Sequence, residues 1–108
     1  GLKLDYISWK NQVVQAQQQG KAIGTSIAEQ KYQQWFSNGC YGQRHYGQLH
    51  SFKGIERPHR LLHEKSRELL QASQQRDPQK VTQLLGEIDQ QCFAVVQAIT
   101  ALQHDIGL

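Results

Sequence analysis

Hydrophobic positions repeat with a helical period in the first part of the chain. They recur at spacings of three and four residues and so share one stripe of a helix: Leu2, Tyr6, Trp9, Val13 and Ala16. Gly20 follows the stripe, and glycine is the residue that most easily takes the left-handed conformation in which many helices end. The pattern predicts a first helix that runs to about Gln19 and that Gly20 closes.

A capping signal indicates a second helix. Ser26 stands three residues before Glu29, the spacing at which a Ser hydroxyl and a Glu side chain satisfy backbone N–H groups at a helix N-terminus. Tyr32, Trp35 and Phe36 follow at helical spacing, and we expect Trp35 and Phe36 to pack in the core, as we do Trp9. This helix should end near residues 38–39.

Two prolines mark the starts of two further helices, because proline at the first helical position sacrifices no needed N–H. The helix from Pro58 carries these residues on one side: His59, Leu62, His63, Ser66, Leu69, Leu70 and Ser73. Asp77 and Pro78 cap and start the last helix. Its apolar stripe covers about seven turns: Val81, Leu84, Leu85, Ile88, Cys92, Val95, Ile99, Leu102 and Ile106.

The stretch from Cys40 to Arg57 has no sustained period and contains glycines, aromatic residues, His45 and His50. It predicts an ordered loop with one short helical turn, and loops of this length are often functional. The four predicted helices indicate an all-α chain, an antiparallel four-helix bundle that forms a single domain over residues 1–108. The last helix is long for such a core and should project beyond it or pack along a second copy, so we expect a homodimer.

Composition limits the classes of function. A chain of 108 residues is long enough for one domain only. It contains neither an apolar run long enough to span a membrane nor a recognisable leader, so we expect no membrane contact by this domain. The net charge of +3 is spread among interspersed acids and bases, which does not indicate nucleic-acid binding. Two cysteines suit a reducing compartment, and we expect a cytoplasmic location.

The candidate chemistry begins with His59 and His63. Side chains four residues apart on a helix are neighbours, so the two imidazoles can reach one metal ion, and their stripe should point both rings into the bundle. Cys40 ends the second helix and could return close to the third, which completes a Cys-His-His set suited to zinc. The alternatives are hydrogen-bonded core histidines and, for Cys40, a small buried side chain or half of a disulfide. Cys92 lies on an apolar stripe, and we expect it to pack in the core.

Three segments of the chain form a pattern: Leu4-Asp5-Tyr6-Ile7-Ser8-Trp9-Lys10-Asn11, then Cys40 with Tyr41-Gly42 and Tyr46-Gly47, and then Pro58-His59-Arg60-Leu61-Leu62-His63-Glu64. Together they resemble the motifs of a known family, the bacterial chemoreceptor zinc-binding domain. The family's ligands are three His and one Cys, so the resemblance implies that Cys40, His59 and His63 hold zinc. Tyr6 stands where the family has its first His. The fourth position is then open to water, to His45 or His50, or the domain has lost its metal and kept its fold.

The resemblance implies a zinc-binding sensory or regulatory domain of a bacterial signalling protein, a chemoreceptor or a diguanylate cyclase. Such a domain responds to zinc or to oxidation of the ligand cysteine, and it acts on an attached output domain. The alternative is a metal-free structural dimerisation bundle without the first ligand. An enzyme is disfavoured, because the segment from His59 to His63 lacks the internal Glu of the His-Glu-x-x-His metallohydrolase motif.

Overall fold

The computed structural model describes residues 1–107, and these residues form helices and no strand. The elements in chain order are α1 (Leu2–Gln19), α2 (Ile27–Phe36), α3 (Tyr41–Tyr46), α4 (His50–Lys53), α5 (Glu56–Gln74) and α6 (Pro78–Asp105). The fold is therefore all-α, as the sequence predicts.

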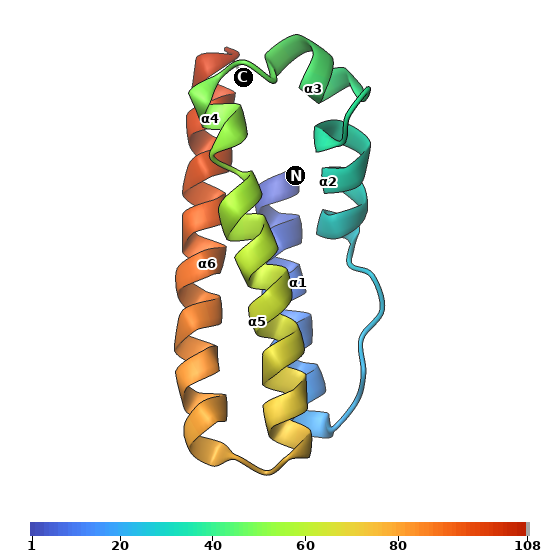
Figure 1. Cartoon of the computed structure of the whole chain (residues 1–108), viewed down its shortest axis with the longest axis vertical. Coiled ribbons are helices and arrows are strands. Elements are labelled where there is room, and N and C mark those ends of the chain that lie inside the picture. The colour runs from blue at the N-terminus through green and yellow to red at the C-terminus, as the bar shows by residue number, and fades with distance from the viewer. Residues whose placement is uncertain (108) are drawn as a thin grey trace.

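Three long helices lie side by side and give the molecule an elongated shape of 45 × 21 × 20 Å (Figure 1). The pairing of α5 with α6 is the most extensive, and α1 packs against both. The shorter α2 packs on α1 and α3 at one end of the molecule. The segment between α1 and α2 runs along the outside as an extended connection (Figure 1). No helix in the described part of the chain is long and apolar enough to cross a membrane.

The predicted helix ends are confirmed at three places. Gly20 adopts a φ of 67° and donates its N–H to carbonyls of the last turn of α1. The hydroxyl of Ser26 accepts a hydrogen bond from the Glu29 N–H at 3.1 Å, which caps α2. The carboxylate of Asp77 caps α6 in the same way, with Pro78 in its first turn.

The core is built from the predicted stripes of α1, α5 and α6. Its largest fully buried side chains are Trp9, Tyr6, Ile55, Leu62, Leu69, Leu84, Ile88, Val13 and Val95. Burying one side chain of this size stabilises the fold by about 1.5–3 kcal/mol, so these positions hold the three long helices together. Trp35 and Phe36 are only half-buried and pack against the edge of this core.

The prediction of a loop over residues 40–57 is wrong in its local structure. The segment folds into α3 and α4, and α5 begins at Glu56, two residues before Pro58. Proline fits there because the first N–H groups of a helix have no intrahelical partner. The short helices form because this path of the chain buries Phe52 and Ile55 against the core and brings Gly42 against Trp35. The spacing of hydrophobic residues within the segment does not predict these contacts.

The last helix does not project alone beyond the core. α4 packs on α6 where α5 no longer covers it, so α4 and α5 together line α6 along its length (Figure 1). The extra length of α6 is therefore covered within one chain. The packing of α4 and α5 on α6 neither requires nor excludes a second copy, so homodimerisation stays a prediction.

Candidate functional site around His59

His59 of α5 lies at the meeting point of three helices. The hydroxyl of Tyr6, from α1, is 2.8 Å from Nδ1 of His59. The ring of Tyr32, from α2, stacks on the imidazole with ring centroids 3.7 Å apart and planes 5° from parallel. Trp9, one turn after Tyr6 on α1, adds a third aromatic ring at 5.7 Å. His59 is thus enclosed by aromatic side chains that its own helix does not supply.

The regular spacing on α1 explains how two of these rings reach His59. Tyr6 and Trp9 are three residues apart, so they lie on the same face of α1, and both are buried against α5 and α6. Tyr32 reaches the imidazole from α2, because α2 packs back onto α1. The Tyr32 ring also stacks with the ring of Phe36, with ring centroids 4.9 Å apart.

Burial determines the protonation states of the two bonded groups. Desolvation, followed by the nearby His63, lowers the pKa of His59 to about 4. Desolvation also raises the pKa of Tyr6, and the neighbouring Tyr32 and Glu29 add to that rise. At neutral pH the phenol therefore keeps its proton and the imidazole is neutral, so the hydrogen bond is donated by the phenol O–H in one tautomer of His59 and by Nδ1–H in the other. In the tautomer that accepts from Tyr6, the single ring proton of His59 is on Nε2.

His63 does not share this enclosure. Its side chain is 48% exposed, and its Nδ1 lies 4.0 Å from a carboxylate oxygen of Glu29. The prediction that both imidazoles point into the bundle holds for His59, which is half-buried, and is wrong for His63. A step of four residues turns about 40° further than one helical turn, which carries His63 away from buried Leu62 towards solvent.

The cysteines occupy two different environments, and both are free thiols. Cys40 is half-buried at the N-cap of α3, where its Sγ lies 3.5 Å from the carbonyl oxygen of Gln33. Cys92 is buried under α1 with its Sγ 3.9 Å from the carbonyl oxygen of Tyr6, and burial raises the pKa of this thiol. The prediction that Cys92 packs in the core is confirmed. His45 and His50 are exposed.

The predicted ligand set does not gather in this conformation. Within residues 1–107, no three His, Cys, Asp or Glu side chains come together as a metal ion would require, so Cys40 stands apart from the pair formed by His59 and His63. The Nδ1 atom of His59 is also taken by the Tyr6 hydroxyl. In this arrangement the three side chains are not gathered around one point, and zinc binding through Cys40, His59 and His63 stays a prediction.

The sequence did not predict that Glu29 and Tyr32 belong to this site. Glu29 has a clear local role in the capping signal of α2, and its side chain also faces His63. Tyr32 follows the helical spacing of its neighbours, yet its stacking on His59 depends on how α2 docks onto α1. Sequence spacing within one helix could not supply either contact.

Comparison of the chain with known protein families, with curated proteins and with solved structures gives no match.

Proposed function

We propose that this chain is a regulatory helical domain of a bacterial signalling protein, of the chemoreceptor zinc-binding type. The contact between Tyr6 and His59 carries the proposal. These residues belong to the first and third segments of the resemblance, and they stand 53 positions apart in the chain. If these segments correspond to the family's motifs, Tyr6 and His59 must lie next to each other. The reason is that Tyr6 stands where the family has its first His ligand, which binds the same metal as the third-segment histidines.

The geometry favours a form of this domain that works without metal. The buried phenol and the half-buried imidazole are hydrogen-bonded to each other, so the phenol is not left as an unpaired polar group in the core. His59 then joins α5 to α1 through Tyr6 and to α2 through Tyr32. Any event that breaks this junction would change how the three helices pack, and an attached output domain could respond to that change.

The second candidate is the zinc-binding form, in which Cys40, His59 and His63 hold the metal. Two observations favour it. His59 and His63 both lie beside the ring of Trp9, at centroid distances of 5.7 and 6.4 Å, and the thiol of Cys40 is neither disulfide-bonded nor fully buried. Bound zinc would cross-link the start of α3 to α5, and oxidation of the Cys40 thiolate would release that link. Tyr6, His45, His50 or water would complete the site.

The domain is proposed to be non-enzymatic, cytoplasmic and paired with a second copy. Large apolar side chains remain exposed on α1 and α6, with Leu4 66% and Phe93 65% exposed. The ion pair between Lys10 and Asp89 joins these two helices, so their exposed faces border one another. A second copy that covered Leu4, Ile7 and Phe93 would remove this apolar surface from water.

Metal content distinguishes the two candidates. Elemental analysis is done on untagged protein purified without added metal, and on Cys40→Ala and His63→Ala variants, with Cys92→Ala as the matched control. The metal-independent form predicts well under one zinc per chain in every sample. About one zinc per chain that is lost in the first two variants and kept in Cys92→Ala would establish the zinc-binding form instead.

A further inference from the structure

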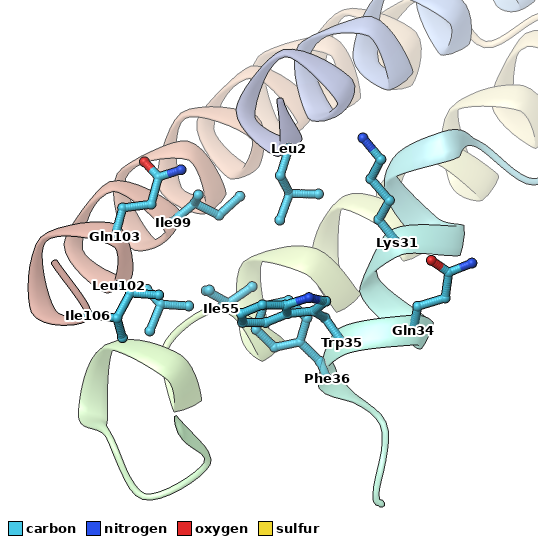
Figure 2. A pocket seen from close by; sticks show the side chains of 10 residues that line it. All are labelled: Leu2, Lys31, Gln34, Trp35, Phe36, Ile55, Ile99, Leu102, Gln103 and Ile106. Carbon is cyan, nitrogen blue, oxygen red and sulfur yellow. The ribbon is translucent and has the colours of Figure 1, made fainter. Parts of the chain in front are cut away.

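An apolar pocket opens at the end of the molecule where α1 begins and α6 ends (Figure 2). Its volume is about 370 Å³. An apolar cavity of about 150 Å³ is enough to bind benzene, so this pocket has room for a bicyclic ring system. Its apolar lining comes from α1, from α2, from the end of α6 and from the residue that precedes α5. These residues are Leu2, Trp35, Phe36, Ile99, Leu102, Ile106 and Ile55.

The aromatic wall of the pocket is held in place from behind. Trp35 stacks on Tyr46 of α3, with ring centroids 5.8 Å apart and planes 12° from parallel. Phe36 lies between Tyr32, at 4.9 Å, and Phe52 of α4, at 4.5 Å. The wall is therefore formed before any ligand arrives, which lowers the ordering cost that a ligand would otherwise meet.

The polar groups at the pocket are electrically neutral as a set. Lys31 is the charged residue among the lining side chains, and its ammonium group is already paired with the carboxylate of Asp5. Gln34 and Gln103 supply amides, which both donate and accept hydrogen bonds. Figure 2 shows Lys31, Gln34 and Gln103 around the apolar side chains rather than among them. An anion that bound here would lose its hydration and would find no unpaired cation among the lining residues to compensate for that loss.

We infer that this pocket binds an uncharged, mainly aromatic molecule of about two fused rings that carries one hydroxyl or N–H group. The ring system lies on Trp35 and Phe36 over the floor formed by Ile55 and Ile99. The polar group reaches an amide of Gln34 or Gln103. Phe36 contacts Tyr32, and Tyr32 stacks on His59. A ligand that lies on Phe36 would therefore be connected to His59 through the rings of Phe36 and Tyr32. Binding itself does not depend on the proposed function.

The test is a two-dimensional NMR titration of the full 108-residue chain, labelled with nitrogen-15, with 2-naphthol and separately with 2-naphthoate. The two probes share one ring system, and only the second is an anion at pH 7. We expect one 2-naphthol per chain, with shifts centred on the Trp35 indole, and an affinity at least tenfold higher than that of 2-naphthoate. Absence of binding, or equal affinity for the two probes, would overturn the inference.

Variants locate the site. Ile106→Trp enlarges a half-buried lining residue at the end of α6 and should reduce 2-naphthol affinity at least tenfold, whereas Leu85→Trp, a half-buried residue of α6 outside the pocket, should not. Should the larger side chain disturb folding, replacement of Gln34 and Gln103 by Ala gives a second test with an expected loss of about fivefold. Replacement of the exposed Gln90 and Gln97 by Ala is its control. Unchanged affinity in the Gln34 and Gln103 variant would contradict the assigned polar contact.

Discussion

The hydroxyl of Tyr6 and Nδ1 of His59 form a hydrogen bond of 2.8 Å between two helices that are far apart in the sequence. Burial lowers the pKa of the imidazole and raises that of the phenol, so both partners are neutral at pH 7. The pair therefore acts as a fixed structural link between α1 and α5. It occupies the place where the family resemblance would put a metal ligand.

Removal of the phenol oxygen tests the strength of this link. Tyr6→Phe keeps the buried ring and leaves Nδ1 of His59 without a partner, so the free energy of unfolding should fall by about 1–3 kcal/mol. Denaturant unfolding followed by far-UV circular dichroism measures it. Tyr41→Phe is the control, because Tyr41 is 52% exposed, and its effect should stay within about 0.5 kcal/mol. Equal effects in the two variants would contradict the role given to the Tyr6 hydroxyl.

The stability of the metal-free protein should fall as the pH is lowered from about 6.5 towards 4. The folded chain holds the pKa of His59 at about 4, below the unfolded value of about 6.5, so the unfolded chain binds the proton first. This contribution is complete above about pH 6.5 and is lost as the pH falls. Because the imidazole is partly exposed, we expect at most about 1 kcal/mol per pH unit from this group.

Unfolding measured in the presence of a chelator over this pH range tests that dependence. In His59→Asn, whose amide oxygen can still accept from Tyr6, the slope of stability against pH should be smaller than in the original protein. His104→Asn is the control, since that side chain is 91% exposed. A slope that His59→Asn does not alter would assign the acid sensitivity to other groups.

Two glycines should respond to alanine with opposite signs. A Cβ on Gly42 would overlap the ring and the carbonyl oxygen of Trp35, so Gly42→Ala should push α3 away from α2 and lower stability by about 1–3 kcal/mol. A Cβ on Gly86, in the middle of α6, meets no atom within 4 Å, so Gly86→Ala should raise stability by about 0.5–1 kcal/mol. Thermal unfolding of both variants checks the signs, and a stabilising Gly42→Ala would refute the close packing of α3 on Trp35.

The sequence predicted the features that depend on neighbours within one helix. The cap at Ser26, the left-handed closure at Gly20 and the start of α6 at Asp77 are local events, and the structure confirms each of them. The apolar stripes of α1 and α6 also predicted which faces are buried.

Features that depend on docking between helices were beyond the sequence. The helical period placed His59 and His63 on one side of α5, but which of them faces inward depends on where α1 and α2 lie. The short helices α3 and α4 gain their stability from Trp35 and the core rather than from their own pattern. The distance from Cys40 to the histidines follows from the path of α2 into α3, which no motif encodes.

Zinc binding by Tyr6→His, compared with the original protein, tests whether Tyr6 stands at the position of a family ligand beside His59. If Tyr6 occupies the position of a family ligand beside His59, this substitution places a third imidazole next to His59 and His63, and three imidazoles can bind zinc with an open fourth position. Zinc titration followed by calorimetry should then show about one zinc per chain, bound at least tenfold more tightly than by the original protein and lost again in Tyr6→His with His63→Ala. A Tyr6→His protein that folds and binds zinc no better than the original would contradict the proposal that Tyr6 stands at the position of the family's first zinc ligand.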